Sequence, residues 1–147
     1  MLAEWLTEET IHQCDRVDDW QQAIALSARP LLARGSIVPE YVDAILRQHR
    51  QLGPYYVLAP GIAMPHARPE EGAKALGLSL LVVREGVVFG SQDNDPVHLI
   101  VMLAAPDSHS HIEMISQLAE FFSCEQDVQA VIRAGSLQAI RDIIFRY

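Results

Sequence analysis

The sequence places one histidine in a short segment whose neighbours make it both rigid and accessible. His66 lies between two prolines and beside small residues, in the segment GIAMPHARP from Gly61 to Pro69. Proline stiffens the backbone, and glycine and alanine leave little bulk around an imidazole. Because histidine ordinarily titrates at about pH 6.5, neutral imidazole is abundant at cellular pH and one ring nitrogen can act as a nucleophile. His66 is therefore the first candidate for chemistry, against the simpler interpretation of an ordinary loop histidine.

A second group of polar residues follows in the segment DSHSHIE, from Asp107 to Glu113. Ser110, followed three residues later by Glu113, predicts a capping box that would place His111 in the first turn of a helix. The start of a helix presents free N–H groups and partial positive charge, which favour an anion. His111 could therefore donate a hydrogen bond to an anionic group such as a phosphoryl oxygen.

The same histidines allow a metal-binding interpretation. His109 and His111 have a common two-ligand spacing, and His66 could supply a third ligand, as in a metal-dependent hydrolase. However, no Cys, Asp or Glu falls in a recognised ligand pattern. We therefore expect neither a metal nor another cofactor, and we interpret His109 as a solvated loop residue.

Arg50 and Arg68 are the basic residues nearest to these segments. A guanidinium group matches the geometry of phosphate, although a surface arginine paired with Glu70 or Glu71 would look the same in sequence. We favour Arg68 as a supporting residue because it shares the rigid segment with His66.

The overall composition limits the classes of function. The chain has 147 residues, half of them hydrophobic, and a net charge of −8, which argues against nucleic-acid binding. Its apolar runs are too short to insert in a membrane, and the N-terminus lacks the basic start of a signal peptide. Cys14 and Cys124 are therefore expected to be reduced thiols in a cytoplasmic protein.

Alternating helical and extended patterns predict an α/β fold. Asp18 and Gln21 fit a capping box that opens a helix ending at Gly35, and Pro39 suits the first turn of a second helix ending at Gly53. Short extended segments follow, and then the helical period returns. The expected strands are 55–58, 61–64, 76–84 and 97–103, and the later helices are 112–122, 125–134 and 137–145. This order favours a single domain in which a sheet is sandwiched between helices on both faces.

Two segments resemble a known family. Residues 53–70 are similar to the active-site region of the mannitol/fructose-type IIA components of the sugar phosphotransferase system, and look most like the ascorbate subgroup and a cryptic mannitol-type relative. Residues 93–118, with Asn94-Asp95-Pro96 and His111-Ile112, are also similar to this group. The resemblance covers nearly the whole chain, so residues 1–147 are expected to form one type-2 EIIA domain with a mixed sheet.

The resemblance implies a role for each candidate residue. His66 would accept a phosphoryl group from the phosphocarrier protein HPr and pass it to a cysteine of a cognate IIB component, as a phosphotransferase that needs no cofactor. His111 would assist without being phosphorylated, at the helix start formed by Ser110. Some mannitol-type members use an arginine near the position of Arg50, so both Arg50 and Arg68 stay candidates for contact with the phosphoryl group. The alternative is a regulatory module in which phosphorylation of His66 controls a partner protein. Neither the sugar (ascorbate, mannitol or another polyol) nor the oligomeric state follows from the sequence.

Overall fold

The sheet has five strands in the order β1-β4-β5-β3-β2 in the computed structural model, which describes residues 1–147. The strand bounds are β1 Ile11–Cys14, β2 Val57–Ala59, β3 Ile62–Ala63, β4 Gly77–Val87 and β5 Val97–Ala104. β1 is parallel to β4 and β3 is parallel to β5, whereas β4–β5 and β2–β3 are antiparallel. The sheet is therefore mixed, as the family resemblance implied.

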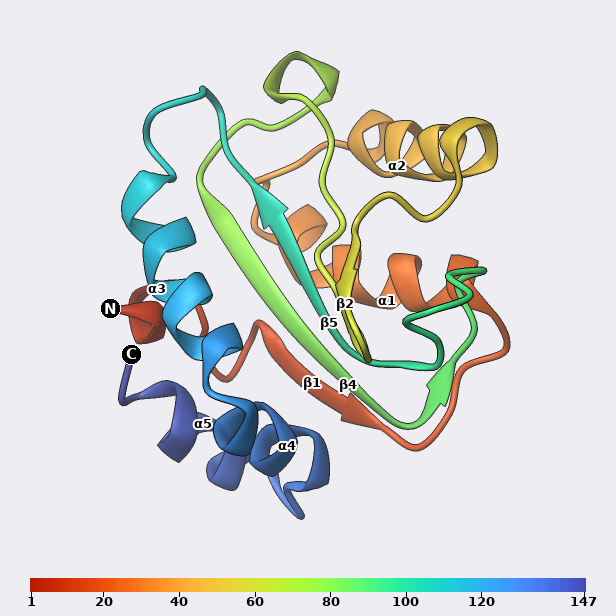
Figure 1. The fold of residues 1–147 in the computed structure, drawn as a ribbon. Helices are drawn as coiled ribbons and strands as arrows, with labels where there is room; N and C mark the ends of the chain where they lie inside the picture. The colour runs from red at the N-terminus through yellow and green to blue at the C-terminus, as the bar shows by residue number, and fades with distance from the viewer.

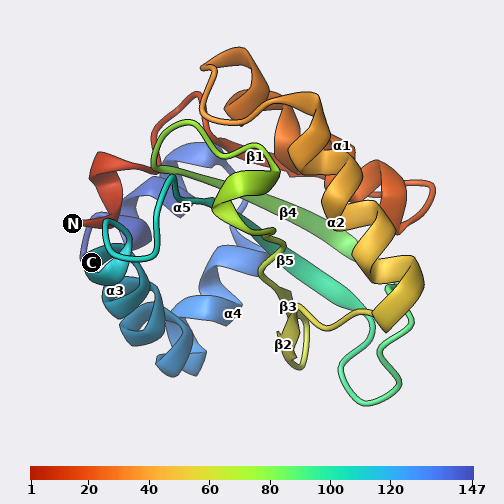
Figure 2. The ribbon, with the colours of Figure 1, turned by 90° about the horizontal axis from the view of Figure 1, so that it is seen from above.

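Helices cover both faces of this sheet (Figures 1 and 2). One face carries α1 (Trp20–Ala33) and α2 (Pro39–Leu52). The opposite face carries α3 (Ile112–Ser123), α4 (Glu125–Arg133) and α5 (Leu137–Ile144). Two short 3₁₀ helices, η1 (Leu2–Glu4) and η2 (Pro69–Glu71), complete the structure. The predicted α/β sandwich is confirmed.

The central strands β4 and β5 are mostly apolar because each contributes to two hydrophobic cores. Leu80 and Val101 pack beneath α3–α5, whereas Leu81 and Ile100 pack beneath α1 and α2. Alternate side chains of a strand point to opposite faces, so a strand buried on both sides has no polar alternation. This explains the two continuous apolar runs in the sequence.

One helix cap was predicted one residue too early, and one strand was not predicted. Asp19, not Asp18, caps α1: its Oδ1 accepts from the Gln22 N–H at 2.8 Å, and the Gln22 Oε1 accepts from the Asp18 N–H at 2.6 Å. The side-chain cap therefore lies one residue later than predicted, and Gln22 accepts from the residue before the cap, so the predicted reciprocal capping box does not form. Strand β1 was not predicted, because its sequence Ile-His-Gln-Cys is half polar and it lies at the edge of the sheet.

The parallel pairing of β3 with β5 positions the segment that contains His66 beside the segment that contains His111. Parallel strands end at the same edge of a sheet, so the chain after Ala63 and the chain after Ala104 leave side by side. Beyond the paired residues, the N–H of Leu103 still donates to the carbonyl of Pro65 at 3.1 Å. His66 and the segment before α3 are therefore brought together, although they are far apart in sequence.

Candidate active site

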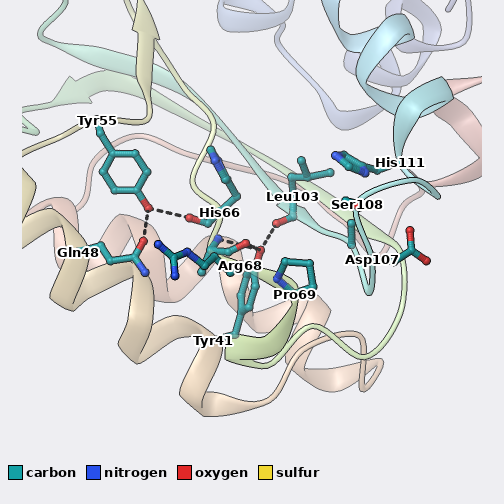
Figure 3. Close-up of a pocket in the computed structure, with 12 residues that line it drawn as sticks. Tyr41, Gln48, Tyr55, His66, Arg68, Pro69, Leu103, Asp107, Ser108 and His111 are labelled. Carbon is teal, nitrogen blue, oxygen red and sulfur yellow. Dashed lines mark hydrogen bonds between the residues drawn. The ribbon is translucent and has the colours of Figure 1, made fainter.

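A pocket of about 400 Å³ opens at this edge of the sheet (Figure 3). Its walls come from α2, from the chain on either side of the β2–β3 hairpin, from the end of β5 and from the segment before α3. The lining residues are Tyr41, Gln48, Tyr55, His66, Ala67, Arg68, Pro69, Leu103, Ala105, Asp107, Ser108 and His111. The pocket thus contains His66, His111 and Arg68 from among the candidates, but neither Arg50 nor Ser110.

The imidazole of His66 is held in one orientation by its own backbone. Its Nδ1 lies 2.8 Å from the carbonyl oxygen of Met64. A carbonyl can only accept, so Nδ1 carries the proton and donates it. In the neutral ring, the lone pair is then on Nε2. His66 is half-buried, and the ring of Tyr55 stands edge-on to it, with ring centroids 6.0 Å apart.

His111 enters the pocket from the start of α3, where the predicted capping box does not form. α3 begins at Ile112, His111 is its N-cap residue, and no side chain forms a capping hydrogen bond there. The predicted Ser110–Glu113 capping box is therefore absent. In Figure 3 the His111 ring and the His66 ring lie on the same side of the pocket, with Leu103 between them. The Nδ1 atom of His111 is buried and has no hydrogen-bond partner.

Asp107 forms the turn that Ser110 was expected to organise. Its Oδ1 accepts from the backbone N–H groups of His109 at 2.8 Å and Ser110 at 2.6 Å. These two hydrogen bonds hold the pKa of the Asp107 carboxyl below its usual value. Aspartate commonly bonds to the backbone two residues ahead, and this was the available sequence signal. Asp107, not Ser110, shapes the approach of the chain to His111.

The two arginine candidates are in different environments. Arg68 lines the pocket, and its guanidinium forms neither an ion pair nor a hydrogen bond. The expected competitor for it, Glu71, instead pairs with Arg47, at 3.2 Å. Arg50 is exposed in the last turn of α2 and lies outside the pocket lining. Of the two, only Arg68 is placed to meet an anion in the pocket.

The remaining histidines and the cysteines lie elsewhere. His109 is exposed and does not line the pocket, and no three His, Cys, Asp or Glu side chains are grouped closely enough to hold a metal ion. His49 is buried in an aromatic cluster, stacked on Trp20 with ring centroids 3.7 Å apart. Cys14 and Cys124 are both free thiols.

Sequence reasoning did not find Tyr41, Gln48, Tyr55 or Ser108 as pocket residues. Tyr41 is buried, but its hydroxyl reaches the pocket wall. Helical periodicity shows which face a residue occupies but not where the end of a long side chain lies. Only the packing of α2 against the His66 segment reveals these residues.

Comparison with known proteins identifies the family to which this arrangement belongs. The family described as "Phosphoenolpyruvate-dependent sugar phosphotransferase system, EIIA 2" matches residues 4–147. The chain belongs to this family. The resemblance inferred from the residues around His66 and His111 is thus confirmed, and the chain is a IIA-type component of the sugar phosphotransferase system.

Individual relatives share this family and its fold. The mannitol-specific cryptic phosphotransferase enzyme IIA component of Escherichia coli is 40% identical over 145 residues, covering 99% of this chain and 98% of that protein. The solution structure of that IIA component, CmtB, matches with a TM-score of 0.92 over 99% of both chains at 40% identity. The ascorbate-specific EIIA component of E. coli is 38% identical over 130 residues, covering 88% of this chain and 84% of the relative.

A more distant structure shares the fold. It is the complex of enzyme IIA-mannitol and phosphorylated enzyme IIB-mannitol from E. coli, which matches with a TM-score of 0.81 at 24% identity and covers 96% of this chain and 97% of that chain. None of the helices of the present IIA protein combines the length and apolar character that crossing a membrane would require.

Proposed function

We propose that this IIA protein is a phosphoryl carrier in which His66 accepts a phosphoryl group from phosphorylated HPr and donates it to the cysteine of a cognate IIB component. The observation that carries the proposal is the hydrogen bond from His66 Nδ1 to the Met64 carbonyl. It fixes the tautomer and leaves the Nε2 lone pair free in a pocket of a phosphotransferase family member. The protein thus acts as a phosphotransferase with a phosphohistidine intermediate.

The reaction proceeds in two balanced steps. In the first, Nε2 of His66 forms a bond to phosphorus while the bond from phosphorus to the histidine nitrogen of HPr breaks, and HPr leaves with its electron pair restored. In the second, the thiolate of the IIB cysteine attacks the same phosphorus, and the bond to Nε2 of His66 breaks. Phosphoryl transfer of this kind depends on alignment and charge stabilisation more than on covalent assistance, so no cofactor is needed.

The pocket supplies the groups that such a transfer requires. The guanidinium of Arg68 is unpaired, and the imidazole of His111 lines the pocket. Both belong to the same pocket as His66, and we assign them to stabilising the negative charge on the transferring group. Arg50 has no such place in the pocket.

Charge and the solved complex support the choice of partners. The net charge of −8 suits a donor that presents basic residues around its own histidine, as the family resemblance implies for HPr. In the E. coli mannitol complex, IIA is bound to phosphorylated IIB. We propose a IIB component as the acceptor for the present chain as well.

The test is phosphorylation by enzyme I, HPr and phosphoenolpyruvate, followed by intact-mass measurement and site mapping. The wild-type protein should gain one phosphoryl group on His66, and His66→Ala should gain none. His66→Ala should still fold, because the side chain makes only one hydrogen bond. His109→Ala is the matched control, since His109 is an exposed neighbour outside the pocket. Undiminished labelling of His66→Ala would overturn the proposal.

A second experiment distinguishes a phosphoryl carrier from a regulatory module. Phosphorylated protein should lose its phosphoryl group when mixed with the IIB component, and the IIB cysteine should gain it. Retention of the phosphoryl group in the presence of every available IIB, combined with altered binding to another protein, would favour the regulatory alternative.

A further inference from the structure

Two tyrosine hydroxyls hold the peptide group that immediately follows His66. The hydroxyl of Tyr55 donates to the carbonyl oxygen of His66 at 2.8 Å, and the N–H of Ala67 donates to the hydroxyl of Tyr41 at 3.0 Å. These two atoms are the two ends of one planar peptide group. The plane next to the reactive histidine is therefore fixed from both sides (Figure 3).

The Tyr41 hydroxyl connects three parts of the site. This hydroxyl accepts from the N–H of Ala67 and also donates to the carbonyl oxygen of Leu103, near the end of β5, at 2.7 Å. Tyr41 itself belongs to α2 and is only 1% exposed. Burial raises the pKa of its phenol to about 12, so the hydroxyl keeps its proton at any physiological pH. A single buried hydroxyl thus ties the His66 segment to a helix and to a central strand.

The Tyr55 hydroxyl makes a weaker contact of the same kind. Its single proton is shared between the His66 carbonyl at 2.8 Å and the Oε1 atom of Gln48 at 2.9 Å. The amide of Gln48 is oriented by Glu71, whose carboxylate accepts from its Nε2 at 2.9 Å and 3.1 Å. Tyr55 is 39% exposed, so water competes for this hydroxyl. Its contribution to holding the loop should be smaller than that of Tyr41.

We propose that Tyr41 and Tyr55 are positioning residues for phosphoryl transfer at His66, an inference that rests on the proposed function. They act through the peptide group and need not touch the phosphoryl group. Fixing that plane, together with the bond from Nδ1 to Met64, aims Nε2 along one line. Transfer between two nitrogens, or from nitrogen to sulfur, requires in-line alignment, and small misplacements of the reacting atom lower the rate.

Tyrosine-to-phenylalanine substitutions test this directly, because they remove only the hydroxyl. Tyr41→Phe and Tyr55→Phe are the test variants, and Tyr56→Phe is the matched control. Tyr56 is adjacent in sequence and fully buried, but its hydroxyl lies 2.6 Å from Nδ1 of His49 and forms no hydrogen bond with residues 64–69. The control therefore loses a buried hydroxyl without loosening the peptide group.

The first measurement is the rate of His66 phosphorylation at varied concentrations of phosphorylated HPr. Tyr41→Phe should lower the maximal rate about tenfold and Tyr55→Phe about threefold, as expected for the loss of one hydrogen bond. The half-saturating concentration of HPr should stay within about twofold, since docking is unchanged. Tyr56→Phe should keep its maximal rate within about twofold even if its Tm falls. Because both hydroxyls hold one peptide group, the double variant should lose less than the product of the single effects.

The second measurement does not depend on transfer. Nitrogen-15 NMR of the unphosphorylated wild-type protein and of Tyr56→Phe should show His66 as a single neutral tautomer with the proton on Nδ1. The double variant, which carries both Tyr41→Phe and Tyr55→Phe, should show a mixture of the two neutral tautomers of His66. If Tyr41→Phe fails to fold, Tyr55→Phe still tests the inference, because Tyr55 is an exposed residue whose loss of a hydroxyl should leave the fold intact.

The outcomes separate this inference from the proposed function. Absence of phosphorylation in the wild-type protein would overturn the proposed function. Normal phosphorylation of the wild-type protein, with rates and tautomer in Tyr41→Phe and Tyr55→Phe equal to those of Tyr56→Phe, would overturn only the positioning role. A rise in the half-saturating concentration of HPr with an unchanged maximal rate would also overturn the positioning role, because that result would assign the tyrosines to docking.

Discussion

Replacing His111 by alanine should separate its contribution to catalysis from its contribution to stability. In the folded protein, the Nδ1 atom of His111 is buried without a partner, and no side chain caps α3 at this residue. The substitution therefore breaks no capping bond, and the free energy of unfolding should change by less than about 1 kcal/mol. By contrast, a hydrogen bond to a charged phosphoryl oxygen contributes about 1.5–3 kcal/mol. If this hydrogen bond forms only in the transition state, its loss should slow transfer about 10- to 100-fold.

The assay measures both half-reactions under single-turnover conditions: phosphorylation by phosphorylated HPr, then transfer to the IIB component. His111→Ala should still be phosphorylated on His66, but more slowly, and should transfer poorly to IIB. His111→Gln keeps a donor and should retain more activity than alanine. His109→Ala is the control, because this exposed histidine lies two residues away and outside the pocket.

Two results would refute the reasoning. If His111→Ala transferred at the wild-type rate in both half-reactions, His111 would be only the N-cap residue of α3. If its unfolding free energy fell by several kcal/mol, the slower transfer could be attributed to a disturbed fold. Urea unfolding of the three variants beside the wild-type protein supplies this comparison.

Three further predictions concern metal, salt and pH. Chelator should change neither Tm nor transfer from phosphorylated HPr, whereas a large fall in Tm would revive the metal-site interpretation of His66, His109 and His111. The second-order transfer rate should fall as salt increases, because the charge of −8 would steer a basic donor; a rate independent of ionic strength would remove the acidic surface from docking. Burial lowers the pKa of His49, so the unfolded state binds a proton at this residue more readily than the folded state does. Neutral His49 therefore contributes to stability above about pH 6.5, and this contribution is lost as the pH falls. The free energy of unfolding of His49→Gln should therefore fall less between about pH 7.5 and 5.5, and an unchanged slope in urea titrations would contradict this.

Much of the local structure was predictable because it depends on neighbouring residues. Pro39 and Gly53 bound α2 as predicted, and Gly135-Ser136 separates α4 from α5, with Ser136 accepting a capping bond from Ala139. The cap of α1 was misplaced because Asp18 and Asp19 are equally suitable by type, and only the backbone geometry selects Asp19. Strand β1 was missed because an edge strand needs no apolar pattern; pairing with β4 defines it.

Reading the sequence alone was enough to single out His66 as the candidate for chemistry and to predict the sandwich that surrounds it. The prolines and small residues around His66, and the two-sided apolar runs of β4 and β5, are local properties that any reader of the chain can see. Only the tertiary structure decided what surrounds His66. The parallel pairing of β3 with β5 brings His111 into one pocket with His66 and Arg68. The packing of α2 delivers the hydroxyl of Tyr41 to Ala67 and leaves Arg50 outside the pocket. These contacts join residues distant in the chain, so no spacing or periodicity encodes them; they follow from the strand order and from the directions of long side chains.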